Sequence, residues 1–257
     1  MTGGPRSTRP DDVPPTDRWF IRPVPDGEAL LFCLPYTGMG ASTYHDWPAS
    51  GLGAFQVVPL QPPGREGRFR EEAHPTHAAF AADLVTAIEP HVRGRRYAFT
   101  AHCGAVPYAL ETIRLARERG LAPPVRLFAS SWGAPHRGLY GRLNHVDLAA
   151  FDAVAEVRSM ARQVGRPLPD DLAELAAEVL AAELAVQRGY SYRPAEPLPC
   201  PVSVIGWSRD DVVPDREVHD GWDECAPVSH HTLDGGHRDY LRCPPALRDL
   251  IARAAGR

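Results

Sequence analysis

The 257-residue sequence contains no lysine, so all 28 of its basic residues are arginines. Together with 32 acidic residues they give a formal net charge of −4 at pH 7. A protein whose main partner is a nucleic acid usually carries a basic excess that neutralises phosphates. We therefore expect no nucleic-acid partner. The absence of lysine itself indicates codon bias rather than a mechanism.

Long apolar runs are also absent. No stretch approaches the ~18 apolar residues that a membrane-spanning helix needs, so we expect no membrane segment. Residues 1–22 are rich in proline, arginine and aspartate and contain no apolar block, so we do not expect a secretory signal there. The same composition predicts that residues 1–17 form a disordered tail.

Cysteine is sparse, and no CxxC pair occurs. The five cysteines are scattered along the chain, at Cys33, Cys103, Cys200, Cys225 and Cys243. Their odd number and wide spacing predict neither a disulfide framework nor a metal site. Free cysteines are typical of a reducing compartment, so we expect a cytoplasmic protein.

Short apolar runs alternate with helical patterns along most of the chain. The runs bounded by Gly, Pro or polar residues predict strands at 29–34, 55–60, 96–100, 125–131, 202–206 and 229–233. The helical patterns between them cover 74–92, 104–119, 214–225 and 239–254. This alternation predicts an α/β fold with a mostly parallel central sheet, built from residues 18–138 and 195–257.

The alternation stops between residues 139 and 194, where two helical patterns occur and no strand is predicted. The first pattern follows a possible cap at Asp147 and has apolar residues at near-helical spacing: Leu148, Phe151, Val154 and Met160. The second has Leu172, Leu175 and Val179 next to Asp171 and Glu174, which fit a capping box. We predict a helical lid insertion over an active site. The alternative is a pair of crossover helices on a face of the sheet.

The most informative stretch is residues 97–106, YAFTAHCGAV. A strand pattern ends at Thr100 and a helical pattern begins after Cys103. Strand, sharp turn and helix is the arrangement of the nucleophile elbow G-x-S-x-G, with Ala101 and Ala105 here replacing the glycines and Cys103 in the nucleophile position. A thiol at a helix N-terminus beside a histidine favours the reactive thiolate. The alternative is a buried, inert cysteine.

An acid and a histidine follow in the order that this fold uses, each after a strand. Asp210 comes four residues after Gly206, and we favour it over its neighbour Asp211 as the acid that orients the histidine. His237 follows the last predicted strand and a pair of glycines. His102, next to the nucleophile, is expected to point into the packing of the sheet.

A fourth element is the strand and glycine-containing turn at residues 32–40. A loop at this place donates a backbone N–H to the oxyanion, together with the residue after the nucleophile. We assign these two donors to Thr37 and Gly104, with Tyr36 as the alternative to Thr37. A plain turn would account for the same glycines.

With these blocks in this order, the sequence resembles the type II thioesterases of polyketide and nonribosomal-peptide assembly lines, which belong to the α/β-hydrolase superfamily. Residues 31–40, LFCLPYTGMG, are similar to the family pattern LFCFPHAGG, and residues 60–66, LQPPGRE, are similar to VQLPGRE. The family elbow GHSMGA corresponds to AHCGAV at residues 101–106. The acid block and the terminal G-G-H also match, so the resemblance covers about residues 18–255.

The resemblance implies an α/β-hydrolase fold and a substrate that is an acyl or aminoacyl group, held as a thioester on the phosphopantetheine arm of an acyl or peptidyl carrier protein. It implies no metal or redox cofactor and a monomeric enzyme. It gives no role to Arg65, for which a structural turn is the simpler interpretation.

Two departures bear on the chemistry. Serine is usual where this chain has Cys103, and PYTGM replaces the more usual PHAGG. An acyl group on cysteine remains an activated thioester. We therefore consider hydrolysis by a Cys103-His237-Asp210 triad, transfer of the acyl group to another carrier protein or an amine or hydroxyl acceptor, and a binding protein that has lost its chemistry.

Overall fold

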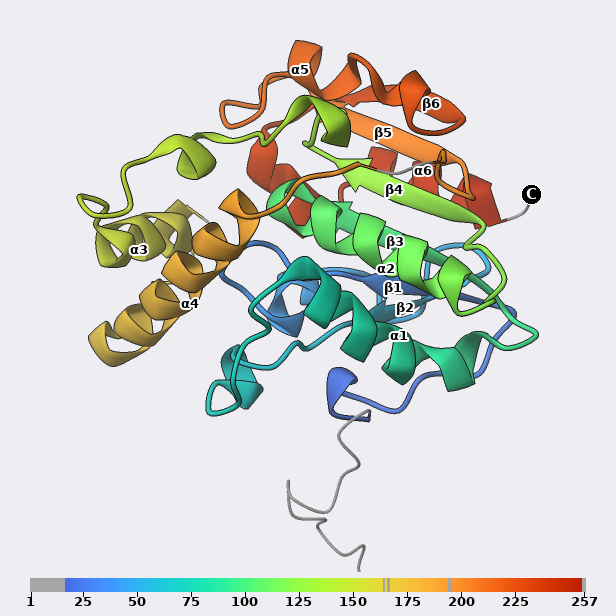
Figure 1. The fold of residues 1–257 in the computed structure, drawn as a ribbon, viewed down its shortest axis with the longest axis horizontal. Helices are drawn as coiled ribbons and strands as arrows, with labels where there is room; N and C mark the ends of the chain where they lie inside the picture. Colours follow the sequence, from blue (N-terminus) through green and yellow to red (C-terminus); the bar gives the residue numbers. More distant parts are fainter. Residues whose placement is uncertain (1–16, 164, 166, 194–195, 256–257) are drawn as a thin grey trace, which may run out of the picture.

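The computed structural model describes residues 17–163, 165, 167–193 and 196–255, which form a parallel sheet with helices on both faces (Figure 1). The predicted tail at residues 1–17 lies outside the described residues except for Asp17, where a short 3-10 helix begins that runs to Trp19. No helix of the described residues is both long and apolar enough to cross a membrane.

Six strands form the sheet in the spatial order β2-β1-β3-β4-β5-β6, and all of their pairings are parallel. Their bounds are β1 Ala29–Cys33, β2 Phe55–Pro59, β3 Arg96–His102, β4 Arg126–Ser130, β5 Val202–Trp207 and β6 Val228–Leu233. The predicted α/β fold class is confirmed. The central strands are predicted because strands covered on both faces of a parallel sheet are continuous apolar runs. The edge strand β6 (VSHHTL) is mostly polar and only partly buried.

Helices cover the two faces of the sheet as separate layers. Helices α1 (His77–Val92) and α2 (Val106–Glu118) lie in front of the sheet in Figure 1, and α6 (Pro245–Ala255) lies behind it. Alternate residues of β1 face the two helical layers. Leu30 and Phe32 belong to the buried apolar cluster that includes residues of α1 and α2, whereas Leu31 belongs to the cluster that includes residues of α6. This period of two is the geometry of an extended strand.

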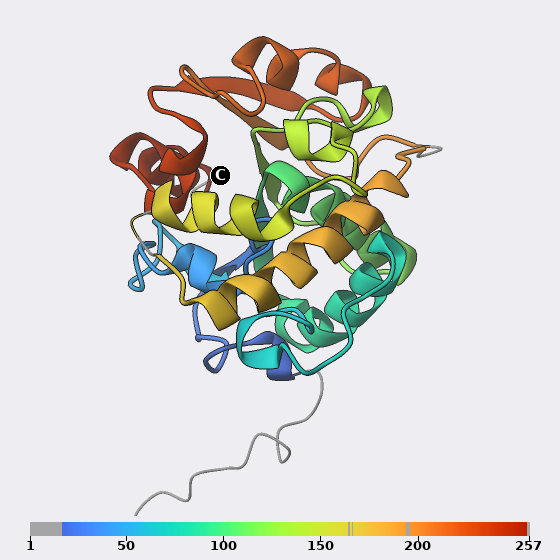
Figure 2. The same cartoon turned by 90° about the vertical axis from the view of Figure 1, so that its left-hand side faces the viewer.

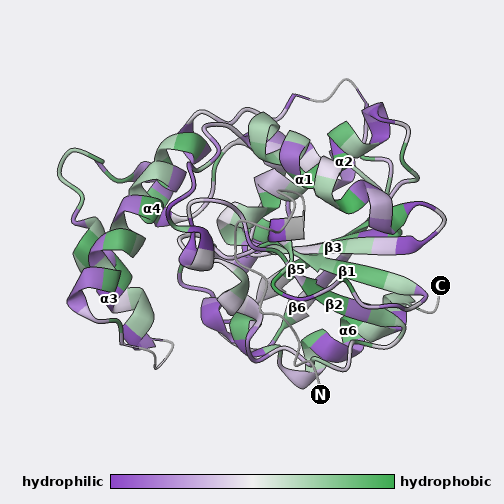
Figure 3. Ribbon diagram, turned by 90° about the horizontal axis from the view of Figure 1, so that it is seen from below, coloured by the Kyte–Doolittle hydropathy of each residue, from purple (hydrophilic) through white to green (hydrophobic). Residues whose placement is uncertain are grey.

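Helices α3 (Ala153–Gln163) and α4 (Asp170–Arg188) lie side by side beyond one end of the sheet (Figures 1 and 2). They pack together through a small apolar cluster of their own that includes Val157, Leu180 and Leu184. In Figure 3 apolar residues predominate in the central strands, whereas apolar and polar residues alternate along these two helices. The pair belongs to the predicted helical insertion, and its described residues contain no strand.

Two helix predictions were too long. The pattern at 214–225 gives only a short helix α5 (Asp215–His219), because Gly221 takes a left-handed conformation (φ 84°) before a 3-10 turn at Trp222–Glu224. The pattern at 239–254 is divided into a 3-10 helix, His237–Arg242, and α6. Cys243 between them also has positive φ (48°), and Pro245 suits the first turn of the new helix.

Both predicted caps in the insertion were wrong. Asp147 accepts a hydrogen bond from Ala149 N–H in a turn (3.0 Å), while α3 begins after Asp152, which accepts one from Ala155 N–H (2.8 Å). Helix α4 begins at Asp170 after Pro169, and no side chain caps it. The capping residue is decided by where the chain enters the helix, and the apolar spacing does not determine that point.

Candidate active site

The predicted nucleophile position lies on a sharp turn between β3 and α2. Cys103 follows the last residue of β3, has a left-handed backbone (φ 53°), and begins a 3-10 turn that leads into α2. Non-glycine residues rarely adopt this conformation, and strain of this kind is common at active sites. Cys103 is therefore held at the carboxyl end of a central strand, where it is 8% exposed.

The predicted acid and histidine form a buried ion pair. His237 Nδ1 lies 3.1 and 3.0 Å from the two carboxylate oxygens of Asp210. Both side chains are fully buried. Asp210 is fixed further by Ser131, whose hydroxyl donates to Oδ2 (2.6 Å), and by backbone N–H groups of the following loop. Asp211, the competing candidate, instead lines a cavity beside the site.

The environment of this pair favours its charged form. Burial raises the pKa of Asp210, but hydrogen bonds from His237 and Ser131 outweigh burial and hold the pKa well below its usual value. Burial lowers the pKa of His237, but hydrogen bonds to Asp210 and Cys103 and the charges of both groups outweigh burial and raise this pKa to about 9. The histidine is thus a cation at neutral pH, next to the sulfur of Cys103.

Tyr36 contributes a contact that the sequence patterns do not reveal. Its hydroxyl lies 3.2 Å from Nε2 of His237, the ring nitrogen that does not face Asp210. Burial raises the pKa of Tyr36, so the phenol keeps its proton. Tyr36 and Cys103 are therefore both hydrogen-bonding partners of His237.

The two predicted oxyanion donors lie next to each other. A Cβ atom added to Gly104 would come within 2.6 Å of the Thr37 hydroxyl, and both residues are buried. The N–H of Tyr36, the alternative donor, is already used, because it donates to the Thr43 hydroxyl (3.1 Å). Thr37 therefore stays the better candidate of the two.

His102 points into the interior, as expected from its place before the nucleophile. Its ring stacks on Tyr240 with the centroids 4.4 Å apart, and Nδ1 lies 2.9 Å from the Ser130 hydroxyl. Burial and the charge of neighbouring His237 hold the pKa of His102 well below its usual value. His102 is therefore a neutral packing residue behind the nucleophile turn.

Several residues around the site escaped the sequence patterns. Ser131 follows the end of β4 and also has positive φ (51°), so a polar residue at a strand end was the signal available for it. Glu183 and Gln187 of α4 reach the candidate oxyanion loops. A glutamate and a glutamine four residues apart, next to Leu184, were the signal for these two.

A cavity of about 440 Å³ opens beside His237. Its lining includes Met39 and Thr43 from one side and Arg209 and Arg238 from the other. Among the residues that the structure describes, no group of three or more His, Cys, Asp or Glu side chains could hold a metal ion.

The parallel sheet carries a strained residue on a strand–turn–helix, and an acid and a histidine follow along the chain at later strand ends. This arrangement is the architecture of the α/β hydrolases. Comparison with protein families identifies the family within this class. Residues 29–253 match the family model described as "Thioesterase domain". This chain belongs to the thioesterase domain family.

Individual relatives agree with this assignment. "Thioesterase PikA5" of Streptomyces venezuelae is 30% identical over 224 residues, which cover 85% of this chain and 79% of the relative. Among solved structures, the type II thioesterase BorB from the borrelidin biosynthetic cluster has a TM-score of 0.77 at 25% identity and covers 93% of this chain and 98% of its own. RedJ, a thioesterase from the prodiginine biosynthetic pathway in Streptomyces coelicolor, has a TM-score of 0.72 at 28% identity. The match covers 93% of this chain and 92% of the RedJ chain.

Proposed function

We propose that this chain is a type II thioesterase that serves a polyketide or nonribosomal-peptide assembly line. Its substrate would be an acyl or aminoacyl group held as a thioester on the phosphopantetheine arm of a carrier protein. The main support is the arrangement of Cys103 on the strained turn beside the buried His237–Asp210 pair. The names of PikA5, BorB and RedJ support the pathway class.

In the first half of the proposed reaction, the thiolate of Cys103 attacks the carbonyl carbon of the thioester. The N–H groups of Thr37 and Gly104 stabilise the negative charge that develops on the carbonyl oxygen. The bond to the pantetheine sulfur then breaks, and the His237 imidazolium gives its Nε2 proton to the departing thiolate. The products are acyl-Cys103, a free carrier-protein thiol and a neutral His237.

Water completes the cycle. Neutral His237 removes a proton from the water as its oxygen attacks the acyl-Cys103 carbonyl, and the bond to Sγ breaks. This step restores the thiolate and the imidazolium and releases a carboxylic acid. Asp210 holds the ring orientation throughout and stabilises the charge on His237.

Residues 139–194 act as the lid in this proposal. Gly141 of this segment lies over the nucleophile, since a Cβ atom added to it would be 3.8 Å from the Cys103 sulfur. Helix α4 contacts the turn after the nucleophile as well. A cover of this kind would exclude bulk water and shape the pocket for the acyl chain.

The proposal is tested by replacing the nucleophile. Cys103→Ala should abolish release of acyl groups from an acylated carrier protein, measured as appearance of the free carrier thiol. Cys225→Ala is the matched control, because it removes a free cysteine outside the site, and it should retain activity. Unchanged release by Cys103→Ala would contradict the proposal.

A second candidate is transfer of the acyl group to another thiol, an amine or a hydroxyl. Two features favour it. The acyl group on Cys103 keeps the energy of a thioester, and the Tyr36 hydroxyl lies 3.2 Å from His237 Nε2, the nitrogen that would activate an attacking water. A protein with both features would store its cargo rather than hydrolyse it.

If transfer is the outcome, Tyr36→Phe should shorten the lifetime of acyl-Cys103 in water several-fold, because water gains access to Nε2. Tyr97→Phe is the control, since that hydroxyl donates to the Ala122 carbonyl at the other end of β3. The lifetime is measured by quenched-flow mass spectrometry with and without an acceptor. Equal lifetimes in all three proteins, unaffected by acceptors, would rule out the second candidate.

A further inference from the structure

Helix α4 carries two buried polar side chains one turn apart, Glu183 (7% exposed) and Gln187 (1% exposed). Residues four apart lie on one face of a helix. Burying a carboxylate is costly unless charges and hydrogen bonds compensate, so the partners of this face indicate what holds it in place.

Glu183 binds the first oxyanion loop. Its carboxylate accepts a hydrogen bond from Gly38 N–H, the residue after Thr37, and pairs with the guanidinium of Arg65. Arg65 is also buried and donates a second hydrogen bond to the Met39 carbonyl (3.0 Å). The Gly38–Met39 backbone is therefore held from two directions by one buried ion pair.

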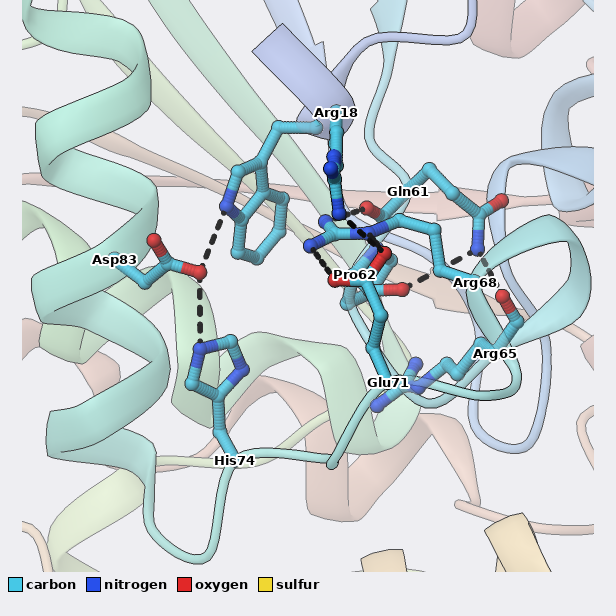
Figure 4. Close-up of polar contacts among 9 residues, drawn as sticks. Arg18, Gln61, Pro62, Arg65, Arg68, Glu71, His74 and Asp83 are labelled. Carbon is cyan, nitrogen blue, oxygen red and sulfur yellow. Dashed lines mark hydrogen bonds and ion pairs between the residues drawn. The ribbon is translucent and has the colours of Figure 1, made fainter. Parts of the chain in front are cut away.

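The loop that carries Arg65 is itself fixed (Figure 4). Gln61 Nε2 donates to the Arg65 carbonyl (2.7 Å), and Arg68 donates to the Gln61 carbonyl (2.9 Å). Glu66 accepts a hydrogen bond from Gly40 N–H (2.8 Å), further along the oxyanion loop. This accounts for the LQPPGRE stretch, whose polar side chains hold residues 39–41 on one side and Glu183 on the other.

Gln187 binds the second oxyanion element. Its side-chain amide donates to the carbonyl of Gly104, the residue after the nucleophile. Gly104 is also in close contact with Thr37, so the two candidate donors share one small space with Gln187. One face of α4 thus reaches both halves of the candidate oxyanion hole.

We propose that Glu183 and Gln187 are positioning residues that hold Thr37 and Gly104 in oxyanion-binding geometry, so that the hole is complete only while α4 is docked. This inference rests on the proposed function. Withdrawal of α4 would remove the carboxylate partner of Arg65 and free the Gly38 and Gly104 peptides to turn. Lid position and oxyanion stabilisation are then one coupled event, and opening of the lid switches off attack by Cys103.

Two reagents for Cys103 separate this role from a general effect on folding. An aliphatic aldehyde such as octanal adds to the sulfur and creates an oxyanion that the hole must bind. Iodoacetamide alkylates the same sulfur without forming an oxyanion. For Glu183→Gln and Gln187→Leu in the full-length chain, we expect aldehyde affinity to fall about tenfold, below the effect of removing a donor outright. Alkylation should stay within about twofold of the parent protein.

Two further variants complete the design. Glu178→Gln changes an exposed acid on the same helix and should behave as the parent. Arg65→Met combined with Glu183→Met replaces the ion pair by apolar side chains and keeps the buried volume, which favours folding. It should also show the weakened aldehyde binding and near-normal alkylation.

Unchanged aldehyde affinity in these variants would overturn the inference, and so would a parallel fall in alkylation, which would indicate general damage to the turn. Neither reagent needs a carrier protein. A parent enzyme that reacts with both reagents but takes no acyl group from a carrier would therefore contradict the proposed function and leave this inference standing.

Discussion

At the scale of single residues, the site is organised around His237. Its two ring nitrogens have different partners, with Nδ1 facing Asp210 and Nε2 facing the Tyr36 hydroxyl, and Cys103 is a further hydrogen-bonding partner of the ring. The sequence patterns predicted the first partner, because aspartate and histidine each follow a strand end and parallel strands bring their carboxyl ends together. They considered Tyr36 only as a backbone donor and missed its contact with the histidine, because the two residues are 201 apart in the sequence and meet only in the folded loop.

The charged pair predicts how stability depends on pH. The pKa of His237 rises from its ordinary 6.5 to about 9, so its stabilising contribution is complete below about pH 6.5 and is lost as the pH rises through 9. The pKa of Asp210 is lowered from 3.8, so its contribution is present above about pH 4 and is lost as the pH falls.

We expect the parent protein to lose more stability between pH 6 and pH 10 than Asp210→Asn does, by on the order of a few kcal/mol. Urea unfolding at the two pH values measures this difference. Asp211→Asn, which changes the neighbouring acid, should follow the parent. If Asp210→Asn loses as much stability as the parent, the buried ion pair does not raise the pKa of His237 as described.

At the scale of elements, the turn after β3 and the loop after β1 both differ from the family pattern, and the two differences fit together sterically. The pattern has methionine where this chain has Gly104 and alanine where it has Thr37. In the structure the Thr37 hydroxyl occupies the space that any Cβ at residue 104 would need. The departures therefore compensate each other sterically, which supports a natural elbow adapted around Cys103.

This packing gives a test. Gly104→Ala places a Cβ 2.6 Å from the Thr37 hydroxyl and 3.2 Å from Gln187 Nε2. We expect slower acylation of Cys103 and a loss of ~1–3 kcal/mol in the free energy of unfolding, because overpacking displaces the loop. Gly67→Ala is the control, because a Cβ atom added to Gly67 meets no atom within 4 Å. Both variants are measured by stopped-flow acylation and urea unfolding. Equal behaviour of both variants would show that the loop has room to move.

The same scale shows the limits of sequence patterns. The positions of the central strands followed from apolar runs, and α1, α2 and α4 followed from helical spacing. The ends of helices did not follow, since Asp152 rather than Asp147 accepts the hydrogen bond at the start of α3. A cap depends on the direction in which the chain enters the helix, and neighbouring elements set that direction.

At the scale of the whole molecule, the order of strand, nucleophile, acid and histidine was enough to predict the fold and the residues that meet at the edge of the sheet. The role of Arg65 could not be predicted, because its partner Glu183 lies 118 residues away on the helical insertion. That ion pair connects the core of the α/β domain to α4. Only the folded arrangement reveals that the conspicuous LQPPGRE stretch serves the oxyanion loop.

The central claim is that Cys103 carries the acyl group, and intact-protein mass spectrometry tests it most directly. The full-length protein is mixed with an acylated carrier protein, quenched in acid at intervals, and digested to locate the added mass. We predict an adduct of the acyl mass on Cys103 that forms as the carrier is unloaded and is absent from Cys103→Ala. Carrier unloading without an adduct on Cys103, at equal rates in the parent and Cys103→Ala, would contradict the account.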